Sequence, residues 1–182
     1  MSLKHSLLAL LSHEAKTGYE LSKDVRGSTG FFWTATHQQI YRDLAELERK
    51  GWVKHKDVSQ SAKPDKKIYS TTKDGLKELK RWLKEPTEPA PGKNAFLIKL
   101  FAGHLIEPGI LLEDLLRHKK LHQAKLKRYA EIEKEYFSAV EKLPVELQFQ
   151  HLTLRRGTIF EKAWLAWCKE TEEFLRKRIK PG

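Results

Sequence analysis

Hydrophobic and polar residues recur with helical spacing in the stretch from Thr36 to Gly51. Its apolar positions Ile40, Leu44 and Leu47 fall at i, i+4 and i+7, so they share one helix face. The stretch begins with a threonine followed three residues later by a glutamine, which is a capping box, and it ends with a glycine, which favours a stop. The pattern therefore predicts one amphipathic helix with a buried stripe.

The opposite face of this helix is polar in an unusual way. It carries Gln38, Arg42 and Arg49, with Gln39 and Tyr41 at its flanks and His37 near its start. Glutamine and arginine offer paired hydrogen bonds to adenine and guanine in the major groove, and a helix N-terminus suits a phosphate. The face therefore predicts a helix that reads DNA. The alternative is an ordinary amphipathic helix with a solvated outer surface.

The residues before this helix fit a helix-turn-helix motif. Leucines predict a first helix ending near His13, and a second capping box, Thr17 with Glu20, opens a short helix that stops at Gly27. A turn rich in glycine and serine and the aromatic triplet 31–33 then lead to the polar-faced helix. The triplet is expected to pack beneath the turn. Two short helices joined by a glycine-containing turn are typical of the motif.

A hairpin is predicted directly after Gly51. The apolar pattern changes to period 2 through Val58, residues 60–67 read as a lysine-rich turn, and residues 68–71 read as a returning strand. A helix-turn-helix followed by a hairpin is a winged helix, whose wing contacts the phosphate backbone or the minor groove. Lys63, Lys66 and Lys67 are its candidate DNA contacts. A solvated turn would also be polar.

The chain is expected to divide at a proline-rich linker. Residues 1–85, closed by a helix that begins after Thr72, form the predicted winged helix, and residues 86–92 form the linker. Residues 93–182 predict a short helix to about Gly103, a long helix from Pro108 to about Lys142, and a last helix from about Val145. The fold class is thus mainly α, an α+β winged helix followed by an all-helical domain.

The helical domain is expected to form a homodimer. Two long helices in a hairpin leave an apolar seam open, and a second copy would cover it through residues 93–180. The first helix of the chain is a further candidate contact. The alternative is packing within one chain against the N-terminal domain. Phe160, Trp164 and Trp167 are candidates to line an effector pocket at the seam, although aromatic residues at helical spacing also build ordinary cores.

Composition narrows the functional classes. The formal charge of +11 over 182 residues suits a polyanionic partner such as double-stranded DNA. No apolar run is long enough for a membrane span, and no secretory signal is recognisable, so a cytoplasmic location is expected. Catalytic motifs are lacking and no cofactor is expected. His118 and His122 have the i, i+4 spacing of metal ligands, but no third ligand lies near them in sequence, and no metal site is predicted.

The order and spacing of these segments resemble the PadR family of bacterial transcription regulators. The matching pieces are Leu7–Leu11, Thr17–Leu21, Phe32–Trp33, Gln39–Leu44, Leu47–Val53, Lys67–Tyr69 and Thr72–Gly75. Residues 93–180, including the segment Phe160–Leu165, resemble the long helical domain of the subgroup related to virulence activators. The resemblance therefore covers nearly the whole chain.

The resemblance implies a dimeric, cytoplasmic regulator, usually a repressor, that binds an inverted repeat and is released by a small phenolic or hydrophobic effector. It places Gln38, Gln39, Tyr41 and Arg42 in the recognition helix and the three lysines in the wing. Tyr19 matches a family tyrosine with either a phosphate contact or a core role. Thr17 stands where many members have histidine, and lysines stand where they have wing arginine.

The alternative function is a winged-helix module that binds a protein partner without reading DNA.

Overall fold

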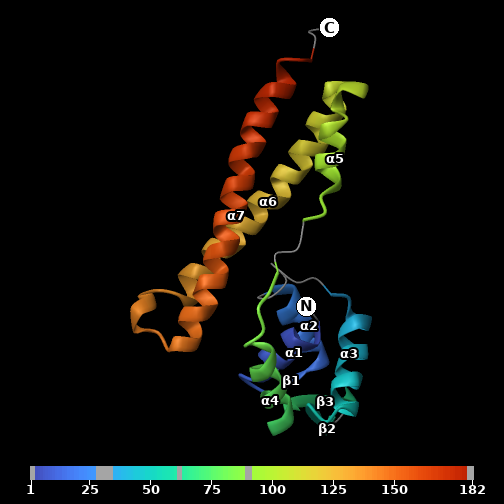
Figure 1. Ribbon diagram of the computed structural model, residues 1–182, viewed down its shortest axis with the longest axis vertical. Coiled ribbons are helices and arrows are strands. Elements are labelled where there is room, and N and C mark those ends of the chain that lie inside the picture. The colour runs from blue at the N-terminus through green and yellow to red at the C-terminus, as the bar shows by residue number, and fades with distance from the viewer. Residues whose placement is uncertain (1–2, 28–34, 61–62, 89–91, 180–182) are drawn as a thin grey trace. The chain divides into compact units, whose positions relative to one another are not determined.

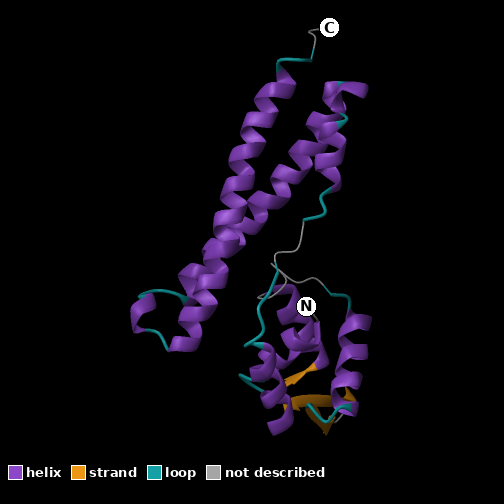
Figure 2. Ribbon diagram, viewed as in Figure 1, coloured by secondary structure: helices purple, strands orange, loops and turns teal. Residues whose placement is uncertain are grey.

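The computed structural model describes residues 3–27, 35–60, 63–88 and 92–179 of the chain. The chain divides into two compact units, Met1–Pro89 and Ala90–Gly182. Within the described residues, the strands belong to the first unit, and the second unit consists of helices and their connections (Figures 1 and 2). The predicted fold class, mainly helical with a small sheet, is confirmed. The aromatic triplet 31–33 lies outside the described residues.

The first unit packs its helices against a small antiparallel sheet. In chain order its elements are α1 (Leu3–Leu11), β1 (Lys16–Thr17), α2 (Gly18–Gly27), α3 (His37–Arg49), β2 (Val53–Gln60), β3 (Lys63–Thr71) and α4 (Lys73–Trp82). The strand order is β1-β3-β2. The core is built from buried residues of α1, α2, α3 and α4, with Val53 and Tyr69 added by the sheet. Four leucines of α1 are thus buried within their own unit, and the fifth, Leu10, is partly buried.

The ends of α2 and α3 lie close to where the sequence predicts them. The Gln39 amide donates to Thr36 Oγ1 at 3.2 Å, and the Thr36 amide donates to Gln39 Oε1 at 2.9 Å, which completes the capping box of α3. The same reciprocal pair joins Thr17 and Glu20 at the start of α2. Gly51 after α3 has φ +70°, a conformation that glycine adopts without strain.

The hairpin is longer than predicted, and the predicted turn at residues 60–67 is wrong. Strand β3 begins at Lys63 and pairs antiparallel with β2. Val58 lies opposite Lys66 whereas Gln60 lies opposite Lys63, so two residues of β3 face one of β2 in a bulge. Strand β1 pairs with β3 at Ile68 and Tyr69, outside this bulge. The tip, residues 61–62, lies outside the described residues.

Two further details of the first unit differ from the expectation. Strand β1 was not predicted, because its two residues, which pair with Ile68 and Tyr69, are too few to show a periodicity of their own. The spacing of Leu76, Leu79, Trp82 and Leu83 predicts one apolar stripe for α4, but only Leu79 of the three leucines is buried, whereas Leu76 and Leu83 are exposed. Trp82 is partly buried and stacks on His5 of α1, with ring centroids 4.5 Å apart.

The second unit is a hairpin of two long helices with a short helix beside it (Figure 1). Its elements are α5 (Ala95–Phe101), the short 3-10 helix η1 (Gly103–Leu105), α6 (Pro108–Tyr136), a second 3-10 helix η2 (Val140–Lys142) and α7 (Val145–Arg176). The predicted end of the long helix at Lys142 is wrong. The helix stops at Tyr136, and Ala139 then takes a left-handed conformation with φ 56°, which continuous helix does not allow.

The core of the second unit lies between α5, α6 and α7. Its buried members are Phe96, Leu111, Leu112, Leu115, Cys168 and Leu175. Further along the hairpin, Tyr129 of α6 is 1% exposed and packs on Gly157 of α7, where a β-carbon would lie 2.9 Å from the tyrosine ring. Cys168 follows Trp167 on an apolar helix face, which predicts a small buried hydrophobic residue. It is fully buried, and burial raises the pKa of its thiol to about 11.

Candidate nucleic-acid interface and effector pocket

The orientation of α3 follows the predicted helical period. Ile40, Leu44 and Leu47 are fully buried, while Gln38 and Arg42 are exposed. The stripe packs into the core of the first unit, so the polar face is directed away from it. This places the two candidate base-reading side chains on one accessible surface of a helix whose start is capped.

The guanidinium group of Arg42 contacts the carboxylate of the neighbouring residue, Asp43. Its side chain is 72% exposed, and its Nε lies 3.4 Å from Oδ1 of the mostly buried Asp43. That contact uses one of the five N–H donors of the guanidinium group. The remaining fork geometry suits bidentate hydrogen bonding to a guanine edge.

Gln39 is engaged in the helix cap rather than directed to a ligand. Its Oε1 accepts the Thr36 amide, so the carboxamide cannot present both its acceptor and its donor to an adenine without opening the capping box. Gln38, which is exposed and has no role in the cap, is the better placed glutamine. Of these two neighbouring glutamines, Gln39 therefore stabilises the start of the helix, and Gln38 remains the candidate for base contacts.

His37 connects α3 to α2. Its Nε2 lies 3.3 Å from Oγ of Ser22, a fully buried residue of α2. The contact fixes the position of the α3 N-terminus relative to the preceding helix. A positioning role therefore accounts for His37 at least as well as a direct DNA contact.

Two tyrosines lie near the start of α2. The ring of Tyr41 covers Gly18 so closely that a β-carbon there would lie 2.5 Å from it. Tyr41 is half exposed, and Tyr19 is 65% exposed, so Tyr19 is not a core residue. Hydrogen bonds from Thr17 hold the pKa of Glu20 below its usual value, and the charge of Lys66 adds to the effect.

The wing has a basic face that the sequence reasoning described only in part. Lys66 and Lys67 are both exposed on β3, and because neighbouring strand residues point to opposite faces, their side chains leave the strand on different sides. The side chain of Lys63 lies outside the described part of the structure. The register places Lys66 on the same face as Lys54 and Lys56 of β2, opposite the face that carries buried Val53. The alternation of residues along the sequence of β2 already indicated that Lys54 and Lys56 share one face.

The three candidate pocket aromatics of α7 take different positions, with Trp167 behind Trp164 at 5.2 Å between ring centroids. Phe160 and Trp164 line one cavity, whereas Trp167 packs in the core against Phe96 with ring centroids 6.2 Å apart. Trp164 stacks on His122 with centroids 3.8 Å apart, and His122 contacts the buried carboxylate of Glu161. Among the described residues no three potential ligands form a metal-binding group.

Two family profiles match the chain. The Transcriptional regulator PadR-like family matches residues 7–81, and the Virulence activator alpha C-term family matches residues 93–176. The "Probable transcriptional regulator Rv1176c" of Mycobacterium tuberculosis is 35% identical over 188 residues, which cover 98% of this chain and all of that protein. The chain belongs to the PadR family of transcriptional regulators. Members of this family regulate transcription by binding DNA and are not enzymes.

Further relatives extend the similarity over both units. The negative transcriptional regulator PadR of Bacillus subtilis is 29% identical over 96% of this chain and 98% of its own. Its structure in complex with operator DNA matches with a TM-score of 0.79 at 25% identity, covering 95% of this chain and 98% of that one. The Vibrio cholerae virulence activator AphA matches with a TM-score of 0.76 at 30% identity, over 97% and 99%.

These matches confirm the predicted family and the winged-helix architecture. Among the helices in the described ranges, none is long and apolar enough to cross a membrane.

Proposed function

We propose that this PadR-family regulator acts as a homodimeric repressor on an inverted-repeat operator and is released by a small hydrophobic or phenolic effector. Residues 1–85 form the DNA-binding domain, residues 86–92 a linker, and residues 93–182 the dimerisation domain. The observation that carries the DNA-binding role is the outer face of α3, where Gln38 and Arg42 are exposed on a capped helix whose opposite face is buried.

The remaining candidate contacts divide into two classes. Arg42 and Gln38 take base edges in the major groove, because their planar donor and acceptor groups match guanine and adenine. Lys66 of the wing, together with Tyr19 and Tyr41 near the start of α2, takes phosphates, which position the protein without reading sequence. Lys63 and Lys67 are further wing contacts. Gln39 and His37 support the helix rather than touch bases.

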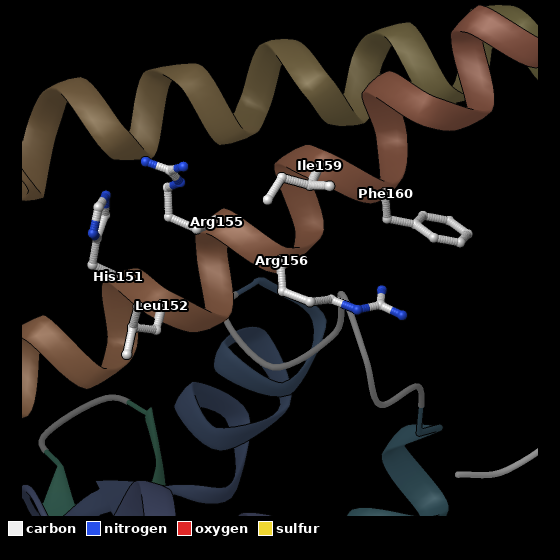
Figure 3. Close-up of a pocket in the computed structure, with 6 residues that line it drawn as sticks. All are labelled: His151, Leu152, Arg155, Arg156, Ile159 and Phe160. Atoms are coloured by element: carbon white, nitrogen blue, oxygen red, sulfur yellow. The ribbon is translucent and has the colours of Figure 1, made fainter.

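Exposed apolar residues of the second unit support a dimer. Around α5 and the start of α6 they include Ile98, Phe101, Leu105 and Ile110, with Phe101 91% exposed. A second group lies on α7, where Leu152, Ile159 and Phe160 line a hollow with three polar residues of the same helix (Figure 3). Surfaces of this kind are normally covered by another chain.

Repression and effector release rest on the relatives. The Bacillus subtilis protein is named a negative regulator, and a structure of it contains p-coumaric acid. Phe160 and Trp164, with Trp167 behind them, supply the aromatic surface that such a ligand would need in this chain.

Selection of bound sequences from random duplex DNA tests the DNA-binding role. Full-length protein is expected to enrich an inverted repeat with half-sites one helical turn or a multiple apart. Failure to enrich any motif would favour the protein-partner alternative. The dimer is tested separately by analytical ultracentrifugation, where Phe101→Asp should weaken association and Lys120→Asp, on exposed α6 surface, should not.

Anisotropy titrations on the selected operator and on random duplex then assign the contacts. Arg42→Ala should lose about 1–3 kcal/mol on the operator and much less on random DNA. Lys66→Ala should weaken both duplexes alike and reduce the salt dependence of binding. Arg128→Ala, which removes an exposed arginine of α6 in the second unit, is the matched control. Equal losses on both duplexes for Arg42→Ala would refute its base-reading role.

A further inference from the structure

His55 of β2 contacts acidic side chains from two elements of the first unit. The C-terminal end of α3 lies beside β2 (Figure 1). Nδ1 of His55 contacts Oε1 of Glu48 in the last turn of α3, and its Nε2 lies 3.6 Å from Oδ2 of Asp57 on its own strand. Asp57 is two residues along β2, so both side chains leave the strand on the same face. We refer to Glu48, His55 and Asp57 as the helix–wing bridge.

The helix–wing bridge is partly shielded from solvent. The His55 side chain is 22% exposed, and its ring lies 5.8 Å from the ring of buried Tyr69 on β3, measured between centroids. Burial raises the pKa of Tyr69, and Glu48 and Tyr41 of α3 and Asp57 of β2 add to the effect. The phenol of Tyr69 therefore stays neutral at pH 7, and the charges of both carboxylates act on the space that His55 occupies.

The charges of the helix–wing bridge balance better when the His55 ring is protonated. Lys67 of β3 lies directly opposite Asp57 in the strand register and faces that carboxylate. Glu48, however, lies in the last turn of α3, where the dipole of the helix disfavours a negative charge. A positive charge on His55 would offset the carboxylate of Glu48 at this helix end.

The geometry of the helix–wing bridge distinguishes the two protonation states of His55. A neutral imidazole ring has one N–H and one lone pair, so it can donate to Glu48 or to Asp57 but not to both. The imidazolium ring has an N–H on each nitrogen. The separation of 3.6 Å on the Asp57 side is longer than a hydrogen bond, so the attraction there depends on the charge of the ring. Protonation of His55 therefore completes the connection between α3 and β2.

We propose that His55 is a positioning residue that fixes the wing against α3, and that its protonation strengthens operator binding. The inference rests on the proposed function, which assigns base contacts to α3 and phosphate contacts to the wing. A protein whose helix and wing are already fixed loses less conformational freedom on binding, which raises affinity. Histidine is the side chain whose charge ordinarily changes between about pH 5 and pH 8, so operator affinity should depend on pH in that window.

Anisotropy titrations of the full-length protein on its selected operator at pH 6 and pH 8, at constant ionic strength, test the proposal. The readout is the ratio of the dissociation constant at pH 8 to that at pH 6. His55→Gln retains a hydrogen-bonding side chain that cannot be protonated, and it should reduce this ratio about 5-fold by weakening binding at pH 6. His13→Gln removes an exposed histidine of the same unit and should leave the ratio unchanged. Equal ratios for the parent and His55→Gln would overturn the proposal.

A second variant keeps the test valid if His55→Gln folds poorly. Asp57 is 65% exposed, and the amide of Asp57→Asn can donate to an unprotonated Nε2 of His55, so that the neutral ring then satisfies both partners. This variant should also reduce the ratio, but by strengthening binding at pH 8. Loss of a negative charge alone would strengthen binding equally at both pH values. A ratio like that of the parent would therefore contradict the proposal, as would weaker binding of Asp57→Asn at both pH values.

Urea denaturation without DNA separates this proposal from the proposed function. Glu48→Gln, His55→Gln and the double variant form a cycle, whose coupling should be about 5-fold in the unfolding equilibrium constant at pH 6 and smaller at pH 8. Absence of coupling at both pH values would refute the bridge, even for a protein that binds its operator specifically. Coupling without specific binding of any duplex would refute the proposed function and, with it, the role of His55 in operator binding. Coupling, specific binding and the expected ratios together support both proposals.

Discussion

Gly75 is the residue whose replacement gives the sharpest test of the first unit. It lies in the first turn of α4, and a β-carbon at this position would lie 2.0 Å from the carbonyl oxygen of Trp52 and 2.9 Å from its carbonyl carbon. The obstacle is backbone, which cannot rotate away as a side chain would. Gly75→Ala must therefore move the start of α4 away from Trp52, which lies in the connection between α3 and β2, here called the α3–β2 corner.

The size of the effect follows from the contacts that this movement disturbs. The Trp52 carbonyl accepts the Thr72 amide at 3.0 Å and lies 3.2 Å from its hydroxyl. Overpacking costs about 1–3 kcal/mol, and weakening these two contacts adds about 1 kcal/mol each. Alanine regains up to about 1 kcal/mol from helix propensity. We expect Gly75→Ala to lower the free energy of unfolding by about 2–4 kcal/mol.

Two other glycines serve as controls for the same substitution. Gly109, in the first turn of α6, has nothing within 4 Å of an added β-carbon, so Gly109→Ala should be neutral or stabilise by about 0.5 kcal/mol. Gly51 is equally open but has φ +70°, so Gly51→Ala should cost about 1 kcal/mol from backbone conformation alone. The three variants thus separate collision, open space and backbone strain.

Urea denaturation followed by tryptophan fluorescence and far-UV circular dichroism measures these differences. Trp52 and Trp82 report on the first unit, and Trp164 and Trp167 on the second. Gly75→Ala should shift the transition of the first unit to lower urea without changing its slope. A Gly75→Ala protein as stable as the parent, or more stable, would refute the close approach of α4 to the corner.

Three further predictions concern capping, the cysteine and acid stability. Thr36→Ala removes both hydrogen bonds of the α3 capping box and should cost about 1 kcal/mol in urea denaturation, whereas an unchanged midpoint would show that the cap does not contribute. Cys168 should not react with Ellman's reagent at pH 8 until denaturant is added, because it is buried and its pKa is raised to about 11; rapid reaction of native protein would contradict this. The pKa of Asp114 falls from 3.8 to about 2 on folding, so its stabilisation is complete above pH 4 and is lost as the pH falls towards 2. Asp114→Asn should therefore reduce the dependence of stability on pH in that window, and an unaltered dependence would argue against the contacts with Lys99 and Arg117.

The elements that the sequence predicts well are those with local signals. The capping boxes at Thr17 and Thr36 mark helix starts by interactions within four residues, and the stripe of α3 fixes its buried face by period alone. By contrast, the first half of β3 contains lysines and a proline, so its sequence does not predict a strand. It forms a strand because it pairs with β2. The end of the long helix at Tyr136 has no proline or glycine to mark it, so the sequence prediction extended to Lys142.

The candidate site shows the same division. The outward direction of Gln38 and Arg42 follows from the helical period. The role of Gln39 in the cap was also visible in the sequence, and it conflicts with a base-reading role for the same side chain. The contact of His37 with Ser22 could not be predicted, because it depends on how α2 and α3 pack.

The corner between α3 and the wing fixes the relative position of the two elements that carry the proposed DNA contacts. The Thr72 hydroxyl donates to the Gly51 carbonyl at 2.6 Å, which ties the start of α4 to the corner, and Glu48 in the last turn of α3 contacts His55 of β2. Contacts thus fix α3, β2 and the start of α4 to one another both at the corner and in the adjoining ends of α3 and β2. If the proposed contacts are right, a substitution at an exposed position such as Arg42 removes one type of contact, so base reading and phosphate binding should be separable there. A substitution that disturbs the corner displaces α3 and the wing together, so base reading and phosphate binding should be weakened together.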